Sequence, residues 1–410
     1  MTRLTTKAVI GALMGLLILS GGLLWLRRQR PSQAQKNQQP TQPSRIDTPK
    51  TGRPIKAKPG TIVLQEVSVW DTNQRSQVSS VGSYQCPPTP NWPVQAAQAV
   101  LTTPAHQLLA RLTQLTSNVN SLSGEQAAEI NDLLAKLAAG GTAAIPAIRQ
   151  FLQDGQDFSF DSIAGGDLVN YGTIRLGLID ALQQIGGPEA LELAASTLQT
   201  TADPFEIAFL SRYLEQQAPG QFRELELTAA RESLALAGQV PIAGVSALFE
   251  LLQAYGDENV VSSLEKAASQ WSYYATLALA GLPNGAGIPT LIKLAQDPAV
   301  SAMGAGDFAL RPLAQVALLY PDAASALLDA ARQNQIPDTA WSTVAGALAG
   351  SYLQYGNQIF GSTSPALNWS PEQVSQQIAL INQLLTVTTS PAGRQALQEA
   401  SASVSSRLTK

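Results

Sequence analysis

The side chains that most often carry catalysis or hold metal ions are scarce in this chain of 410 residues. It contains one cysteine, Cys86, and one histidine, His106. This count excludes an internal disulfide and any metal site that needs several ligands of these types. A Ser-His-Asp or Cys-His arrangement would have to use one of them, and no nucleophile elbow is present. We therefore predict no catalytic, metal-binding or cofactor-binding residues and no cofactor. Cys86 is interpreted as an inert thiol, with a crosslink to a second chain as the alternative.

Carboxylates are the remaining candidates for chemistry. Residues 61–410 contain 29 Asp or Glu and 15 Lys or Arg, and hence a charge of −14, whereas residues 1–60 carry +10. The acidic body argues against nucleic-acid binding, which rests on neutralising phosphate charge. Two paired carboxylates would suffice for glycoside hydrolysis, with aromatic side chains stacking on the sugar. The aromatic candidates are Trp271, Tyr273, Tyr274, Trp341, Tyr352 and Tyr355. At helical spacing, however, such side chains usually belong to the core.

The elements that would position any such groups are helices, and residues 175–198 show how they are built. Apolar side chains recur at helical spacing on both sides of a break, from Leu178 to Ile185 and from Leu191 to Leu198. Gly186 can adopt the left-handed conformation that ends a helix, and Pro188 fits the first turn of the next one. The segment therefore predicts two helices, each with one apolar stripe that needs a partner.

The order of helix, Gly or Pro turn and helix returns along the chain. Ser123 and Gln126 form a capping box before a stripe that ends at Gly140, and Ser370-Pro371-Glu372-Gln373 opens a late helix in a similar way. The prolines that precede second helices lie 42, 53, 48 and 32 residues apart; they are Pro146, Pro188, Pro241, Pro289 and Pro321. An irregular period centred on the forties is typical of stacked helical pairs.

Residues 181–190, with the sequence ALQQIGGPEA, resemble the HEAT-like repeat family, including the short bacterial phycobilisome-lyase-type repeats. The resemblance covers roughly residues 125–390 and is interrupted by long inserts at 154–170 and 350–368. It implies an α-solenoid of stacked helical pairs. Such families are mostly scaffolds and binding surfaces, and they provide no catalytic motif to transfer onto these residues.

Residues 8–26 contain no charged side chain and are long enough to cross most of a hydrocarbon core of about 30 Å. Arg3 and Lys7 precede this run, and Arg27 and Arg28 follow it, as expected for a membrane span with charged ends. We predict a single-pass transmembrane helix that acts as a signal-anchor, after a short tail at residues 1–7. A cleaved signal peptide is the alternative.

The orientation of this span stays open. Two Lys or Arg precede it and four follow soon after, which by the positive-inside rule alone would leave the body in the cytoplasm. The short basic lead and the Gln/Pro/Thr-rich sequence that follows are instead typical of exported bacterial proteins. We favour a location at the cell (inner) membrane with a periplasmic or extracellular body, and keep the cytoplasmic orientation as the alternative.

Residues 27–60 are predicted to form a disordered basic linker, because six prolines and few apolar residues occur between positions 31 and 60. The linker is either a plain spacer or a segment that also lies against anionic lipid. Residues 61–93 begin with the only strongly β-prone run and are predicted to form an extended arm.

These observations predict an all-α protein with a HEAT-like α-solenoid at residues 94–410, carried by the membrane anchor and linker. The expected function is that of a membrane-tethered scaffold without catalytic activity, which binds a protein or peptide partner on a concave face lined by the second helices of the pairs. The alternative function is that of an exported carbohydrate-active enzyme with an α/α toroid and two catalytic carboxylates.

Overall fold

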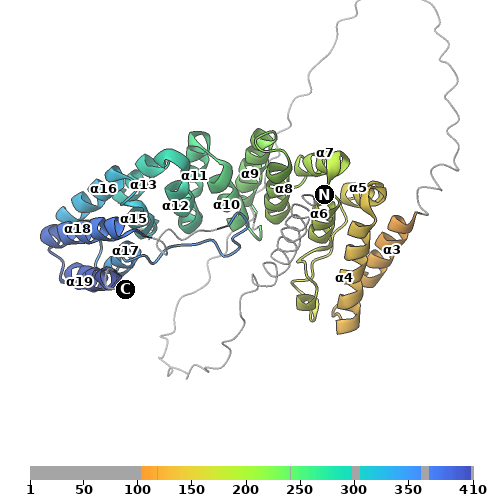
Figure 1. Cartoon of the computed structure of the whole chain (residues 1–410), viewed down its shortest axis with the longest axis horizontal. Coiled ribbons are helices and arrows are strands. Elements are labelled where there is room, and N and C mark those ends of the chain that lie inside the picture. Colours follow the sequence, from red (N-terminus) through yellow and green to blue (C-terminus); the bar gives the residue numbers. More distant parts are fainter. Residues whose placement is uncertain (1–102, 118, 241, 298–304, 362–368, 408–410) are drawn as a thin grey trace, which may run out of the picture. The chain divides into compact units, whose positions relative to one another are not determined.

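The computed structural model describes residues 103–117, 119–240, 242–297, 305–361 and 369–407 (Figure 1). In these residues the chain forms sixteen α-helices and no β-strand, so the prediction of an all-α fold is confirmed. The helices are α3 (Pro104–Thr116), α4 (Gly124–Ala139), α5 (Ile145–Gln153), α6 (Ile174–Ile185), α7 (Gly187–Leu198), α8 (Pro204–Gln217), α9 (Arg223–Ala237), α10 (Ser246–Tyr255), α11 (Val261–Ala267), α12 (Ser272–Gly281), α13 (Ile288–Gln296), α15 (Ala305–Val316), α16 (Pro321–Arg332), α17 (Trp341–Leu348), α18 (Pro371–Val387) and α19 (Pro391–Ser405).

The helices pack in sequence and form two rows. We call α4, α6, α8, α10, α12, α15, α17 and α19 the first row, because each of them contacts the next one in that order. On the other side α3, α5, α7 and α9 follow one another, and α13, α16 and α18 do the same. Helices adjacent in the chain join the two rows, as in the α3–α4, α7–α8, α12–α13 and α18–α19 contacts. Most helix contacts are therefore between elements that are close in the sequence.

The local signals that predicted helix starts are present as expected. Ser123 accepts the backbone N–H of Gln126, whose side chain accepts the N–H of Ser123, and Ser370 and Gln373 form the same reciprocal pair at α18. Both capping boxes satisfy N–H groups that have no partner inside the helix. Prolines stand in the first turn of α5, α7, α13 and α16, where the missing N–H costs no hydrogen bond.

The turn between α6 and α7 has a glycine-specific backbone. Gly186 has φ 66° and ψ −169°, and its N–H donates to Leu182 O at 3.0 Å. The positive φ was predicted, but this ψ lies in a region that is more strongly restricted to glycine than the left-handed helical region. A Cβ at Gly186 would meet no atom within 4 Å. A larger residue here is therefore disfavoured by the backbone conformation and not by a clash.

The core is built from leucine, isoleucine and many small residues, which let the helices approach closely. A Cβ on Gly177 of α6 would lie 2.7 Å from Leu134 Cδ1 of α4, so a larger residue at this crossing would force the Leu134 side chain to move. Large side chains are fully enclosed at only a few places, such as Tyr213 of α8, Phe249 of α10 and Trp341 of α17. Dense packing of this kind makes the helix stack sensitive to volume changes at the interfaces between neighbouring helices.

Two stretches interrupt the helical order, at the positions where the sequence predicted inserts. Residues 154–173 fold back on the start of α4, where Leu122 N donates to Ala164 O at 2.8 Å and Asn131 Nδ2 donates to Leu168 O at 3.1 Å. The second stretch, after α17, crosses several first-row helices and is described below.

The predicted tail, membrane span, linker and arm at residues 1–93 lie outside the described residues, as does Cys86. Among the helices that the structure does describe, none is both long enough and apolar enough to cross a membrane.

Candidate functional site

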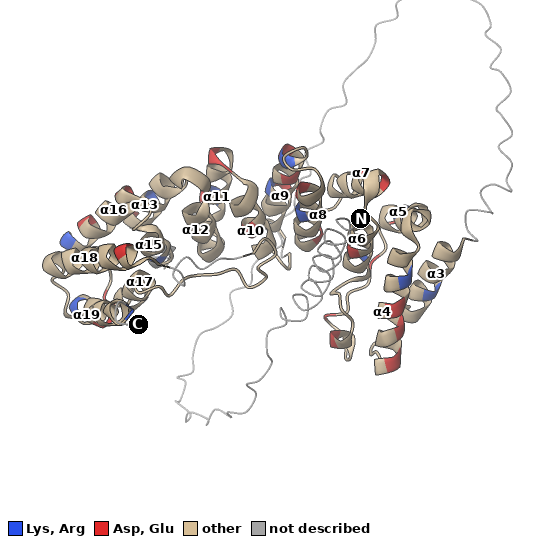
Figure 2. Ribbon diagram, in the orientation of Figure 1, with Lys and Arg blue, Asp and Glu red and all other residues tan. Residues whose placement is uncertain are grey.

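Residues 350–361, which we call the strap, run back from α17 over the helices of the first row (Figure 1). The strap contains no helix, and its polar contacts reach α15, α12, α10 and α8 in turn. It also contains no Lys, Arg, Asp or Glu, so that it is tan throughout in Figure 2. It is held by hydrogen bonds, mostly to its backbone, and by apolar packing.

The segment between α17 and α18 begins and ends beside the same side chain, Arg407. Arg407 donates from Nη2 to Ala349 O at 2.6 Å, and its guanidinium lies 5.3 Å from the centroid of the Trp369 ring. Tyr352 contacts Trp369 edge to face at 6.5 Å. The chain thus returns to its starting point, so the path along the first row is not needed to connect α17 with α18. Long loops without secondary structure are uncommon inside compact domains and are usually either functional segments or linkers.

The first half of the strap alternates between the protein and solvent. Leu353 and Tyr355 are buried, whereas Ser351, Gln354 and Gly356 are exposed. This period of two is typical of an extended chain that lies on a surface.

Polar side chains of α15, α12 and α10 hold this part of the strap. Gln315 Oε1 accepts the N–H of Leu353 at 3.2 Å, and the Tyr273 hydroxyl donates to Gln354 O at 3.1 Å. Further along, Asn357 Nδ2 donates to the Ser246 hydroxyl at 2.9 Å. The first two contacts recognise the backbone and do not depend on the side chains of the strap.

Near the end of the strap, an arginine and a glutamate form hydrogen bonds with one peptide group. Arg212 of α8 donates from Nη1 to Ile359 O at 3.2 Å, and Glu250 of α10 accepts the N–H of Phe360 on Oε1 at 2.8 Å. The carbonyl and the N–H belong to the same peptide unit, so the two charges bind its two polar ends. We call Arg212 and Glu250 the clamp.

Burial shifts the protonation equilibria of the clamp. The pKa of Glu250 is raised, mainly by burial, while hydrogen bonds from the N–H groups of Phe360 and Ile359 and the charge of Arg212 act in the opposite direction. Burial also lowers the pKa of Arg212. Buried charges are costly unless they are paired and hydrogen-bonded, so the peptide group between them compensates part of this cost.

Apolar contacts surround the clamped peptide group. Ile359 is only 3% exposed and packs with Ala208 of α8 and Ala247 of α10. The Phe360 ring contacts Tyr255 edge to face at 5.0 Å. Small residues on the two helices thus leave room for a branched side chain of the strap.

The aromatic residues that were considered for sugar stacking pack mostly against one another. Tyr355 of the strap stacks on Tyr274 of α12 at 6.4 Å, and Tyr274 in turn stacks on Phe249. Trp271 contacts Phe249 edge to face, and Trp341 is buried in the core. Trp341 is therefore a core residue, and Trp271, Tyr273 and Tyr274 are partly buried and pack against the core. The other two candidates, Tyr352 and Tyr355, belong to the strap.

No protein-family model and no curated protein sequence matches the chain at a significant level.

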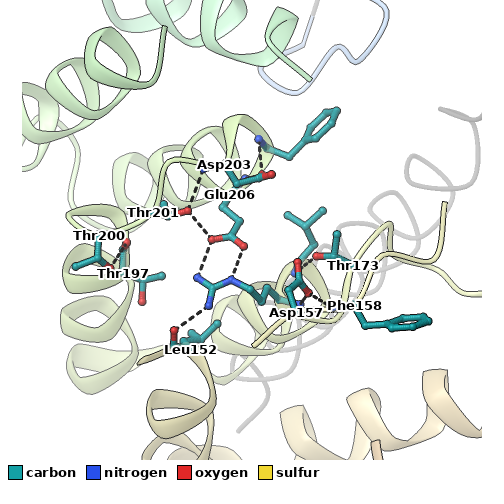
Figure 3. A network of polar contacts seen from close by, with 12 residues as sticks. Leu152, Asp157, Phe158, Thr173, Thr197, Thr200, Thr201, Asp203 and Glu206 are labelled. Carbon is teal, nitrogen blue, oxygen red and sulfur yellow. Dashed lines mark hydrogen bonds and ion pairs between the residues drawn. The ribbon is translucent and has the colours of Figure 1, made fainter. Parts of the chain in front are cut away.

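A second polar cluster joins α5, α6 and α8 (Figure 3). Arg175 donates to both carboxylate oxygens of Glu206, from Nε at 2.6 Å and from Nη2 at 2.9 Å, and from Nη1 to Leu152 O at 2.8 Å. The Thr201 hydroxyl donates to Glu206 Oε2 at 2.7 Å. Every one of these groups is occupied by a partner from a neighbouring helix or turn, which indicates a structural role.

Two further carboxylates beside this cluster are also committed to the fold. Asp203 caps α8 by accepting the N–H groups of Phe205 and Glu206, and Asp157 accepts the N–H groups of Phe158 and Arg175. Burial is the largest cause of the raised pKa of both aspartates. Their hydrogen bonds fix loop geometry and the start of a helix.

A third polar cluster, with two glutamates, lies where α8, α9 and α10 meet. Glu226 is fully buried, neither of its carboxylate oxygens has a hydrogen bond, and burial with the nearby charge of Glu215 raises its pKa to about 7. Arg223 pairs with Glu215 and donates to Tyr255 O at 3.1 Å, and its Nε lies 3.8 Å from Glu226 Oε2. A carboxyl of this kind is poised to change charge near neutral pH.

The remaining candidate sites for catalysis or metal binding are a pocket between α7 and α9 and the surroundings of His106. A pocket of about 340 Å³ between α7 and α9 is lined by a single acidic residue, Glu232, and so does not supply two carboxylates. His106 contacts Thr103 and Gln150 near the start of α3. Within the described part of the chain, no group of three or more His, Cys, Asp or Glu is placed to hold a metal ion.

The sequence indicated the strap only as an insert. Arg212 and Glu250 carried no signal, since 147 and 110 residues separate them from their strap partners. The expected binding face was that of the second helices. Four of them, α5, α7, α13 and α16, lie outside the first row, whereas the helix after Pro241, α10, lies in the first row and contacts the strap. A partner on the second helices stays a prediction.

Proposed function

We propose that the chain is a membrane-tethered, HEAT-like helical-repeat scaffold that binds an extended segment of a protein partner and has no catalytic activity of its own. The observation that carries this proposal is the clamp, in which Arg212 and Glu250 hold both polar ends of one peptide group. Recognition of an extended chain through its backbone, with pockets for alternate side chains, is an established mode of peptide binding.

The path of the strap supports the same conclusion. Since Arg407 holds both Ala349 and Trp369, a short connection would have joined α17 and α18. Ordering additional residues along α15, α12, α10 and α8 costs conformational entropy. The surface of these four helices that contacts the strap, which we call the groove, must offset this cost by favourable contacts. A surface that can order an uncharged, extended segment of its own chain has the chemistry to order a similar segment of another protein.

The membrane part of the proposal rests on the sequence. Residues 8–26 would anchor the chain, and residues 27–60 would give the helical body a reach of roughly 30 Å as a flexible linker. The scaffold would then hold its partner near the membrane.

A peptide selection tests the proposed function. The bait is the full chain with residues 351–361 replaced by a Gly/Ser sequence of equal length, which we call the strap-swap variant, and the library contains random twelve-residue peptides. The matched counter-bait carries Arg212→Met and Glu250→Gln in addition. We expect peptides that bind the first bait and not the second. Enrichment of no such peptides by a bait with native helix content would refute the proposed face.

The alternative of a carbohydrate-active enzyme is tested on the wild-type chain. Release of reducing ends from a panel of β- and α-linked oligosaccharides, abolished by substitution of a carboxylate, would favour it over the scaffold. The arrangement of the candidate aromatic residues does not favour it, because Tyr274, Tyr355 and Trp271 are engaged with one another or with Phe249.

A further inference from the structure

We propose that the strap occupies the groove as an intramolecular ligand and competes there with the partner. The partner is a polypeptide segment in which an aromatic residue is followed, four positions later, by an aliphatic residue and, five positions later, by a second aromatic residue. This inference rests on the proposed function and specifies the partner and its control.

The required side chains follow from what the groove encloses. Tyr355, 5% exposed, lies against Tyr274, and Ile359 fills the space between Ala208 and Ala247. Phe360 packs edge to face on Tyr255. Gln354 and Gly356 point to solvent, so their positions do not restrict the sequence of a ligand. Asn357 adds a hydrogen bond to Ser246, and Leu353, two positions before Tyr355, is also buried. The apolar pattern is thus aromatic, three intervening residues, aliphatic and aromatic, with a further aliphatic residue two positions before the first aromatic one.

The register of the ligand is set by the clamp and by two contacts to the backbone. The clamp requires a peptide group between the aliphatic and the second aromatic position. Tyr273 requires a carbonyl one residue before the first aromatic position, and Gln315 requires an N–H two residues before it. Any polypeptide can supply these groups. Exchange of the strap for another segment therefore needs no rearrangement of the helices.

The strap is an imperfect ligand, which favours its role as a competitor over that of a permanent part of the core. The buried Tyr355 hydroxyl has no hydrogen-bond partner. A buried polar group without a partner lowers stability. A ligand with phenylalanine at the first aromatic position would avoid this cost and should bind more tightly than the strap sequence.

The strap can leave without unfolding the helices. It contributes a few buried side chains and lies on helices whose main contacts are with their neighbours in the two rows. Local opening of such segments costs much less than global unfolding. While bound, however, the strap competes as an intramolecular ligand, with an effective concentration on the order of millimolar.

Binding of the strap sequence in trans tests the inference. The probe is a fluorescent peptide of residues 350–361, GSYLQYGNQIFG, and binding is followed by anisotropy. We expect it to bind the strap-swap variant and to bind the wild-type full chain at least tenfold more weakly. The clamp substitutions Arg212→Met and Glu250→Gln in the strap-swap variant should weaken binding at least tenfold.

Peptide variants test the side-chain pattern. Ile359→Ala in the peptide should weaken binding at least tenfold, whereas the matched control Gln354→Ala should leave it unchanged because that side chain is exposed. Tyr355→Phe should strengthen binding by about five-fold, since it removes a buried hydroxyl without a partner. Equal loss from Ile359→Ala and Gln354→Ala would overturn the proposed pattern.

The outcomes separate this inference from the proposed function. If the strap peptide does not bind a strap-swap variant that retains its helical circular dichroism, the inference is overturned. The proposed function would still be upheld if the random library yields peptides whose binding depends on the clamp. Equal binding to wild type and strap-swap would overturn the competition.

If the strap-swap variant fails to fold, the full chain with Ile359→Ala and Phe360→Ala replaces it. It should then show faster hydrogen exchange in residues 350–361 and tighter binding of the probe than the wild type. Unchanged probe binding despite a loosened strap would likewise overturn the competition.

Discussion

Replacement of Arg175 by methionine should reveal how strongly neighbouring helices depend on one buried ion pair. The side chains of Arg175 and Glu206 are only 12% and 3% exposed, and the pair is bidentate. Arg175→Met would leave the Glu206 carboxylate buried with Thr201 as its remaining side-chain donor. Removing one partner of a buried pair typically costs about 3–5 kcal/mol, and the additional loss of the contact to Leu152 O places this site within that range.

Guanidinium unfolding of the full chain, followed by circular dichroism at pH 7, measures this cost. The matched control is Arg332→Met, which breaks the exposed Arg332–Asp329 pair on α16 and should cost less than about 1 kcal/mol. The double variant Arg175→Met/Glu206→Met should recover most of the loss, because it also removes the unpaired charge. A loss below about 1 kcal/mol for Arg175→Met, or additive losses in the double variant, would refute this account of the cluster.

Three further predictions concern other parts of the molecule. The pKa of Glu226 is raised to about 7 from the ordinary value of 4.5, so this carboxyl favours the folded state below pH 4.5 and loses that contribution as the pH rises through 7. Glu226→Gln should therefore flatten the decline in unfolding free energy between pH 5 and 8 relative to wild type, by up to about 3 kcal/mol; parallel curves would contradict it. Gly186→Val should cost at least about 1 kcal/mol and accelerate hydrogen exchange in residues 175–198, because its backbone has φ 66°; unchanged protection there would contradict the strained turn. Finally, the full chain should sediment with membranes while a variant that starts at residue 61 does not, and a membrane-impermeant thiol reagent should label Cys86 in intact cells; labelling only after lysis would contradict export.

The helices could be predicted because their signals are local. The capping box at Ser123, the proline at the start of α7 and the apolar spacing along α6 each act within one or two helical turns. Such signals are readable from a single sequence because the interacting groups are three or four residues apart. The positive φ of Gly186 was predicted for the same reason, although its ψ differs from that of the expected left-handed conformation.

The polar clusters could not be predicted because their members are distant in the sequence. Arg175 and Glu206 are 31 residues apart, and Arg212 binds the carbonyl of a residue 147 positions away. No local pattern distinguishes Arg212 from other arginines on helices. The strap had a weak signal, since it stands in an insert and combines buried Leu353 and Tyr355 with an exposed residue between them. This alternation is too short to indicate where an extended segment lies.

The clamp also explains why two charged side chains face an uncharged strap. If the strap were only a connector, apolar residues at the positions of Arg212 and Glu250 would hold Ile359 and Phe360 without the cost of burying charges. An isolated peptide group in an apolar groove would instead lack partners for its carbonyl and N–H. The clamp supplies both partners to the Ile359–Phe360 peptide group. In the proposed exchange, the two charges would regain water when the segment leaves. Under that proposal, a peptide group satisfies the two charges while the strap is bound and water satisfies them after it leaves, so the exchange of one segment for another would cost little.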